Sequence, residues 1–290
     1  MKDPIAILGA NGVYARHLIP RLIGAGYPVS AIVRRADAAG TARASGATIK
    51  VADIFDTPSM TAAFEGCTMA INLATSLPGP SGRGDFQAND RLRVEGVPNF
   101  VEACRRSGVR RILQQSIAFV NASGNADWSD EDTVYHPAED SIATRAIAAA
   151  LQMEGSIRSS DLDWVILRGG LFYGPGTGFD DDWYARASAG KLRIPGEGSD
   201  YVSLIHIADM AAATIATIQN WPSHSALIVC DDEPGKWRDV FEFISSSLGV
   251  SVPESGGRVG FPSFRLRNTR ARMALGWQPF YRSFREGLAR

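Results

Sequence analysis

The sequence predicts an α/β fold in which helices cover both faces of a doubly wound, mostly parallel sheet. Short β-rich runs alternate with helical patterns along the first part of the chain. Most of the runs are largely apolar, which is typical of strands buried on both faces. They span 4–8, 29–33, 47–51, 69–73, 110–116 and 163–168.

Helical patterns fill the segments between these runs. After Gly12, apolar residues recur at helical spacing over 15–23, and Gly24 marks the end of the pattern. Thr57 followed by Pro58 predicts a helix N-cap and the first helical residue after it. Strand–helix alternation of this kind indicates a doubly wound sheet rather than separate all-α and all-β units.

The chain after Arg168 predicts a second, smaller lobe. Glycine- and proline-rich turns, GGLFYGPGTG and IPGEG, interrupt the alternation there. Strand patterns over 201–207 and 226–230 flank a helical pattern over 208–219. We expect parts of 200–230 to pack back on the first unit, so the two predicted domains are 1–168 and 169–290.

The composition is that of an ordinary globular protein. Of 290 residues, 45% are hydrophobic, and the formal net charge is −1. That balance indicates neither a nucleic-acid nor a membrane partner, so a small-molecule substrate is expected. Cys67, Cys104 and Cys230 are far apart, which favours neither a disulfide framework nor a metal site. The short apolar run near the N-terminus is no signal peptide, and the expected location is the cytoplasm.

The turn after the first predicted strand suits the pyrophosphate of a dinucleotide. Gly9, Asn11, Gly12 and Val13 lie between this strand and the first helix, in the pattern GxxGxxA. Glycines let the backbone approach a pyrophosphate, which then meets free N–H groups and the positive end of the helix dipole. The glycine spacing alone is a weak signal for dinucleotide binding, but its position directly after the first predicted strand strengthens it. The alternative is a tight turn without a ligand.

Two arginines end the second predicted strand, where an NAD site usually carries an acidic residue. The guanidinium groups of Arg34 and Arg35 can bind the 2′-phosphate of NADP, so NADP(H) is the expected cofactor and NAD the alternative. A solvated pair at a strand end is the competing interpretation. Asp53, after the third strand, would accept a hydrogen bond from the adenine amino group or cap a helix.

The chain resembles the extended short-chain dehydrogenase/reductases, also called NAD(P)-dependent epimerase/dehydratases. The resemblance covers nearly the whole length and implies a Rossmann-type domain with a smaller C-terminal substrate lobe. It also implies a homodimer formed through helices at 86–107 and 140–155. The stretches that carry it, in family order, are ILGANGVYARHL, VADIFD, AINLATS, GVRRILQQS, LDWVILRGGLFYGPGTG, YVSLIHIADMA, CDDEPGKWRDVFEFI and LGWQPFYRSFREGL.

The resemblance also implies which residues contact the cofactor and the substrate. Ser116, at the end of the fifth strand, would hydrogen-bond the reacting oxygen of the substrate. Besides the first turn, the cofactor would meet residues after the third, fourth and sixth strands. These residues are Asp53 and Ile54 at the adenine, Leu73, Ala74 and Thr75 along the nicotinamide half, and Gly169, Gly170 and Leu171 near the nicotinamide.

The helix after the fifth strand departs from the family pattern. The family places Tyr-x-x-x-Lys there, in which the tyrosine supplies a proton and the lysine holds the nicotinamide ribose. Counted from Ser116, Ser141 falls where the tyrosine is expected and Arg145 where the lysine is expected, and a shift of a few residues stays open. A serine hydroxyl is too weak an acid without a dedicated base. Arg145 keeps the charge and would still hold the ribose.

Three other side chains are candidates for the missing acid. Tyr135 and His136 lie just upstream of Ser141, and Tyr173 follows the sixth strand. Isolated tyrosines and histidines in loops are more often surface or packing residues. His206 lies at a strand-to-helix junction and is expected to form a structural hydrogen bond near the helix start.

The functional expectation is an NADP(H)-dependent oxidoreductase that acts on a small carbonyl or alcohol through an atypical active site. One alternative is a redox-inactive dinucleotide-binding sensor or scaffold like the NmrA-type regulators, which keep the glycine turn and lack the tyrosine. A sugar-nucleotide epimerase or dehydratase ranks last, because that chemistry depends on the tyrosine. NADPH turnover separates the first two expectations.

Overall fold

The main layer of the molecule is a seven-stranded sheet with the order β11-β7-β5-β4-β1-β2-β3, in a computed structural model that describes residues 2–78, 84–137 and 139–289. All neighbouring strands in it run parallel. This confirms the doubly wound α/β fold. Its strands are β1 (Ile5–Leu8), β2 (Val29–Val33), β3 (Thr48–Val51), β4 (Met69–Asn72), β5 (Arg111–Ile117), β7 (Asp163–Gly169) and β11 (Ser225–Val229).

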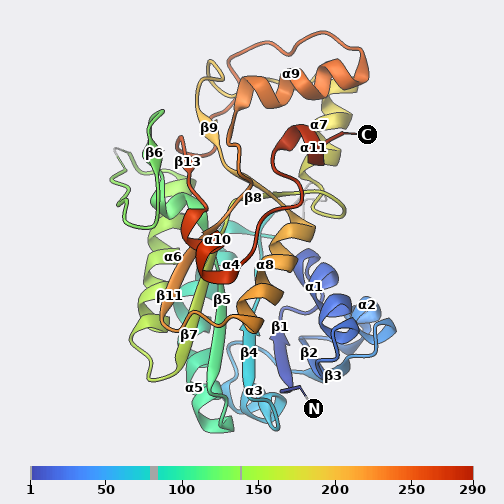
Figure 1. The fold of residues 1–290 in the computed structure, drawn as a ribbon, viewed down its shortest axis with the longest axis vertical. Helices are drawn as coiled ribbons and strands as arrows, with labels where there is room; N and C mark the ends of the chain where they lie inside the picture. The colour runs from blue at the N-terminus through green and yellow to red at the C-terminus, as the bar shows by residue number, and fades with distance from the viewer. Residues whose placement is uncertain (1, 79–83, 138, 290) are drawn as a thin grey trace.

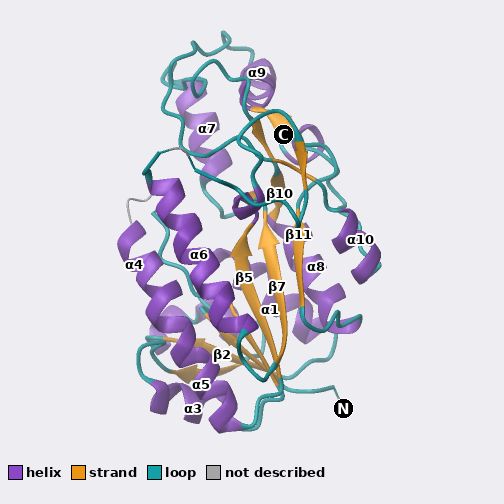
Figure 2. Ribbon diagram, turned by 90° about the vertical axis from the view of Figure 1, so that its left-hand side faces the viewer, coloured by secondary structure: helices purple, strands orange, loops and turns teal. Residues whose placement is uncertain are grey.

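Helices cover both faces of this sheet (Figure 2). On one face, α1 (Val13–Gly24) packs beside α8 (Ile207–Gln219), and α2 (Gly40–Ala44) packs against α1. The other face is covered by α3 (Thr57–Phe64), α5 (Val97–Ser107) and α6 (Ile142–Arg158). Each layer has its own apolar core, because the continuously apolar strands bury side chains on both faces.

Two of the predicted helix starts can be located in the structure. The helix predicted after Gly12 is α1, which begins at Val13 and buries residues at the expected spacing. The N-cap predicted at Thr57 is wrong by one residue, because Asp56 is the N-cap of α3 and Thr57 already belongs to the helix. Pro58 is tolerated at either of the first two helical positions, where no backbone N–H is required.

The small lobe lies above the carboxyl ends of the main strands (Figure 1). Its core is rich in aromatic side chains, among them Tyr173, Trp183 and Trp237. Three two-stranded sheets contribute: β8 (Leu171–Tyr173) with β10 (Leu204–His206), β9 (Tyr201–Val202) with β12 (Gly235–Lys236), and β6 (Trp128–Ser129) with β13 (Arg265–Leu266). Its helices are α7 (Phe179–Ser188), α9 (Trp237–Leu248) and α11 (Phe284–Gly287), whereas α10 (Thr269–Leu275) packs back on β11 and α8 of the main layer.

The segment between β4 and β5 is an interrupted helix. It consists of α4 (Phe86–Arg91), the π-helical turn η2 (Leu92–Gly96) and α5. Both α4 and η2 lie against α6. Within the described ranges no helix has the length and apolar character that crossing a membrane requires.

Candidate active site

The turn after β1 comes unusually close to the loop after β4. Gly9 has a φ of +78°, and a Cβ atom there would lie 2.7 Å from the backbone nitrogen of Ala74. Only glycine allows both this conformation and this approach. The turn and the loop therefore lie side by side at the carboxyl ends of β1 and β4, where the order of a doubly wound sheet reverses and ligands bind.

The N-terminus of α1 fits a pyrophosphate. Gly12 is the N-cap and leaves the first N–H groups without a capping side chain. The first turn, from Val13 to Arg16, contains no acidic residue. Unpaired N–H groups and the helix dipole together attract an anion. The loop after β8 lies against the same end of the helix, because Nε2 of His17 and the carbonyl oxygen of Pro175 are 2.8 Å apart.

The two arginines after β2 have different surroundings. Nε of Arg35 donates to Oδ1 of Asp37 at 3.0 Å, and both side chains are exposed. Arg34 is exposed and has no hydrogen bond or ion pair in the described parts of the chain. Sequence reasoning overlooked Asp37, although it stands two residues after Arg35. Of the two guanidinium groups, that of Arg35 is therefore engaged by a carboxylate and that of Arg34 is not, and the role of either toward a 2′-phosphate stays a prediction.

The remaining predicted cofactor residues lie along the same edge. Oδ1 of Asp53 accepts the N–H of Phe55, so this carboxylate shapes its own turn, and Ile54 is buried. Leu73 is buried and Thr75 exposed. Gly170 is buried, and a Cβ atom there would lie 2.6 Å from the carbonyl oxygen of Ser203. The nicotinamide role of Gly169, Gly170 and Leu171 stays a prediction.

Ser116 has a buried partner. Its Oγ donates to Oε1 of Glu154 at 2.7 Å, and both residues are almost inaccessible. The hydroxyl therefore lies between β5 and α6, where it is hydrogen-bonded to the Glu154 carboxylate. A role toward the reacting oxygen of a substrate stays a prediction that requires this hydrogen bond to open.

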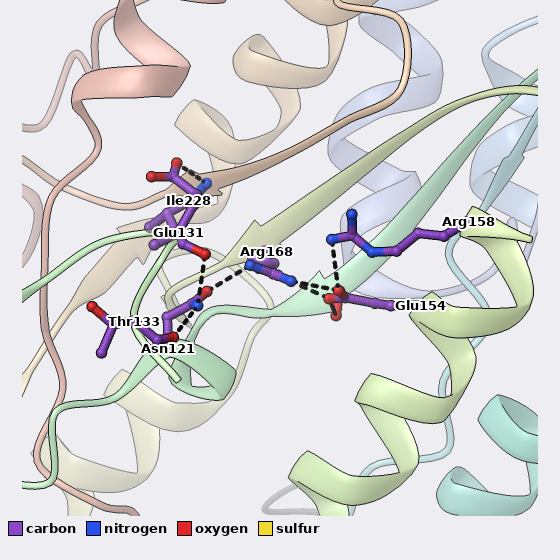
Figure 3. Close-up of polar contacts among 8 residues, drawn as sticks. Asn121, Glu131, Thr133, Glu154, Arg158, Arg168 and Ile228 are labelled. Carbon is purple, nitrogen blue, oxygen red and sulfur yellow. Dashed lines mark hydrogen bonds and ion pairs between the residues drawn. The ribbon is translucent and has the colours of Figure 1, made fainter. Parts of the chain in front are cut away.

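Glu154 is the centre of a buried polar network (Figure 3). Arg168 donates to both oxygens of Glu154, with distances of 2.9 and 2.5 Å. The same guanidinium donates to Oδ1 of Asn121 at 2.8 Å, and Asn121 donates to the carbonyl oxygen of Thr133 at 2.8 Å. The network joins α6, β7 and the chain after β5. Sequence reasoning missed Glu154 and Arg168, because their pairing depends on how α6 packs on β7.

The segment SIATR forms the start of α6. Ser141 is the N-cap, and its Oγ accepts the N–H of Thr144 at 3.1 Å. Oγ1 of Thr144 accepts the N–H of Ser141 in return, which completes a capping box. NH1 of Arg145 donates to Oδ2 of Asp140 at 2.8 Å, and 57% of the Arg145 side chain is exposed. The structure thus gives Ser141 a structural role and Arg145 a surface partner.

The three other candidate acids differ in burial and in their contacts. Tyr173 is fully buried and donates to Oδ2 of Asp231 at 3.0 Å. Burial, reinforced by the Asp231 carboxylate, raises the pKa of Tyr173 far above its ordinary value. His136 is exposed, and Tyr135 is half-buried against the core beside α6.

His206 is structural, as expected from its position. It is the N-cap of α8, where its Nδ1 accepts the N–H of Ala208 at 3.2 Å. Burial lowers the pKa of His206 to about 4. A neutral imidazole is what this capping hydrogen bond requires, because a protonated ring has no acceptor nitrogen.

Comparison with known proteins agrees with this geometry. An NAD(P)H-binding family model matches residues 9–219. The chain belongs to the extended short-chain dehydrogenase/reductases. Its relatives include a 3-diazoavenalumate denitrifying reductase of a Streptomyces species, which is 32% identical with 99% of both chains covered. A decarboxylating sterol-4-alpha-carboxylate 3-dehydrogenase of Dictyostelium discoideum is 21% identical, covering 86% of this chain and 77% of the relative.

This extended short-chain dehydrogenase/reductase also has the fold of solved structures. A UDP-glucose 4-epimerase of Thermotoga maritima, solved with UDP-glucose, has a TM-score of 0.81 at 18% identity, covering 99% of this chain and 96% of that chain. The family relationship makes the chain an NAD(P)-dependent enzyme of the oxidoreductase and epimerase type. The role of the glycine turn and of the start of α1 in holding that cofactor stays a prediction, which their geometry fits.

Replacing Ser141 with alanine is expected to lower the free energy of unfolding by about 1 kcal/mol, because the capping box is lost. Cofactor affinity and turnover should remain near those of the unchanged protein. Ser141→Asp, which keeps an N-cap acceptor, serves as the matched control for stability. Chemical denaturation and initial rates measure the two quantities, and a rate loss of 100-fold or more, about the lower end for a true acid–base group, would restore Ser141 as a catalytic residue.

Proposed function

We propose that this enzyme is an NADP(H)-dependent reductase that directs a hydride to a small electrophile whose reduction needs no proton from α6. The observation that supports this is the start of α6. Ser141 is engaged in a capping box and Arg145 in a surface ion pair. When bound, the reduced nicotinamide supplies the hydride, and the residues of this chain orient it and exclude water.

The proposed substrate is an aromatic diazo compound with an oxygen substituent on the same ring. Carbonyl reduction leaves an alkoxide, a strong base that requires an acid beside it. In a diazoquinone, the hydride forms a C–H bond at the carbon that carried nitrogen, the C–N bond breaks and dinitrogen leaves. The electron pair of the hydride becomes the C–H bond, the C–N pair leaves with dinitrogen, and the negative charge remains on the oxygen as a phenolate. A phenolate is the conjugate base of a group with a pKa near 10, so no buried acid is needed. The name of the Streptomyces relative supports this class.

A small carbonyl compound is the second candidate substrate. The surroundings of Tyr135, a candidate proton donor, favour it. Its hydroxyl has no hydrogen-bond partner in the described parts of the chain. The chain just before it is tied to the buried network through Thr133. Loss of carbonyl reduction in Tyr135→Phe, with cofactor affinity kept, would support this candidate.

NADPH consumption with two substrate panels tests the proposal. One panel contains ortho-diazoquinones and the other small aldehydes and ketones, and dinitrogen release is followed in parallel. We expect NADPH oxidation with stoichiometric dinitrogen in the first panel. Turnover confined to the second panel supports the carbonyl candidate, and cofactor binding without any turnover supports a sensor.

NADPH is expected to bind more tightly than NADH by about 1.5 to 3 kcal/mol, the contribution of one charged hydrogen bond from Arg34 to the 2′-phosphate. Arg34→Asp should reverse this preference, because its carboxylate repels the phosphate. Arg35→Ala is the comparison variant and should have a smaller effect, since Asp37 already occupies that guanidinium. Calorimetry measures the dissociation constants, and equal values for the two cofactors would refute the assignment.

A further inference from the structure

Two buried hydrogen-bond donors lie on the interrupted helix between β4 and β5, outside every site that the sequence indicated. They are Asn89 on α4 and Arg93 on the π-helical turn η2. Residues four positions apart on a helix share a face. That face looks toward α6 and the loop after β4, and Figure 2 shows α4 and α6 side by side. π-Helical turns are frequent at functional sites.

Arg93 is buried, and its one carboxylate neighbour among the described residues is Asp90, at ion-pair distance. Only 9% of its side chain is exposed, and NH1 donates to the carbonyl oxygen of Ala146, in the first turns of α6, at 3.0 Å. The nearest acidic oxygen, Oδ1 of Asp90, is 3.6 Å away, which is too long for a hydrogen bond. A guanidinium has five N–H donors, so this charge retains donor capacity for a ligand.

Asn89 has a buried donor without a partner. The residue is 1% exposed, and its Oδ1 accepts the N–H of Ser76 at 2.9 Å. That hydrogen bond fixes the orientation of the amide, because a flipped amide would bring two donors together. Among the described residues, Nδ2 has no acceptor. A buried donor left unsatisfied is costly, and a ligand that supplies the missing acceptor explains it.

Both donors lie at the nicotinamide side of the cofactor site. Ser76 follows Leu73–Thr75 in the loop that Gly9 approaches, at the carboxyl end of β4. Ala146 lies in α6, whose early turns carry the ribose-holding lysine in the family that this chain resembles. Arg34, which is assigned to the 2′-phosphate, stands at the opposite side of β1, after β2.

We propose that Arg93 and Asn89 bind the nicotinamide ribose hydroxyls. The positive charge would then come from η2 and the second donor from α4, in place of side chains at the start of α6. The proposal rests on the nicotinamide cofactor and is independent of the substrate class.

The test compares two ligands that differ in the nicotinamide half. NADPH contains both halves, whereas 2′,5′-ADP has the adenosine and the 2′-phosphate but no second ribose. Calorimetry on Arg93→Met should show affinity for NADPH lowered about 10- to 150-fold, the equivalent of one charged hydrogen bond, with affinity for 2′,5′-ADP unchanged. Arg93→Lys should recover part of the loss. The matched control is Arg106→Met, because Arg106 is an exposed arginine of α5 paired with Glu102.

A second variant separates binding from folding. Asn89→Asp keeps the oxygen that accepts from Ser76 and removes the donor, and its carboxylate lies one helical turn from the Arg93 guanidinium, which compensates the buried charge. The fold should therefore be retained while NADPH affinity falls by about 3-fold or more, the equivalent of at least one neutral hydrogen bond. Equal losses for NADPH and 2′,5′-ADP in Arg93→Met would show a packing role and overturn the proposal. Unchanged NADPH affinity in both variants would overturn it as well. Neither readout involves the substrate, so a failure of the diazo reductase proposal leaves this test intact.

Discussion

Replacing Gly12 with valine is expected to abolish cofactor binding while the fold persists. Gly12 has a φ of −70°, which any residue adopts, and a Cβ atom there meets only the carbonyl oxygen of Gly9, at 3.2 Å. The branched side chain would occupy the space in front of the first N–H groups of α1. A pyrophosphate makes several charged hydrogen bonds there, each contributing about 1.5 to 3 kcal/mol, so a loss of about 100-fold or more is expected.

Calorimetry with NADPH measures this loss, and thermal unfolding verifies the fold. Gly24→Ala is the matched control, since Gly24 ends the same helix and a Cβ atom there has open space. Normal NADPH affinity in Gly12→Val would place the pyrophosphate elsewhere and remove the basis for the cofactor site described here.

Replacing Arg168 with methionine is expected to reduce the free energy of unfolding by about 3 to 5 kcal/mol. The side chain of Arg168 is 7% exposed and that of Glu154 is 2% exposed. Removing the guanidinium takes two donors from the buried Glu154 carboxylate and frees the amide oxygen of Asn121. The carboxylate then keeps only the Ser116 hydroxyl and a 3.4 Å contact to the exposed Arg158 among the described residues. Chemical denaturation measures the change.

Two further variants separate this effect from lost packing. The double variant Glu154→Met with Arg168→Met should be less destabilised than Arg168→Met alone, because no poorly compensated carboxylate remains buried. Arg145→Met removes an exposed ion pair and should cost about 1 kcal/mol or less. If Arg168→Met were as mild as Arg145→Met, the buried network would not hold this part of the fold.

The sheet and the first turn could be predicted because they depend on local patterns. Continuous apolar runs indicate strands buried on both faces, and each of the six predicted runs contains a strand of the main sheet. The turn from Gly9 to Gly12 carries its own signal, since its spacing and its place after the first strand are both local.

The chemistry after β5 could not be predicted in the same way. A serine directly before an alanine-rich helix is an ordinary N-cap signal, yet family spacing directed attention to a catalytic role for Ser141. The pair of Glu154 and Arg168 depends on the packing of α6 on β7. The shared face of Asn89 and Arg93 depends on a π-helical turn, for which the sequence offered no recognised signal.

The transfer of deuterium from NADPH to an ortho-diazoquinone tests the central proposal most directly. The cofactor is doubly deuterated at nicotinamide C4, and the phenol product is analysed by mass spectrometry and NMR. We expect one deuterium at the carbon that carried the diazo group and one dinitrogen released per NADPH oxidised. Bound NADPH that is not oxidised, or a phenol without deuterium at that carbon, would contradict it.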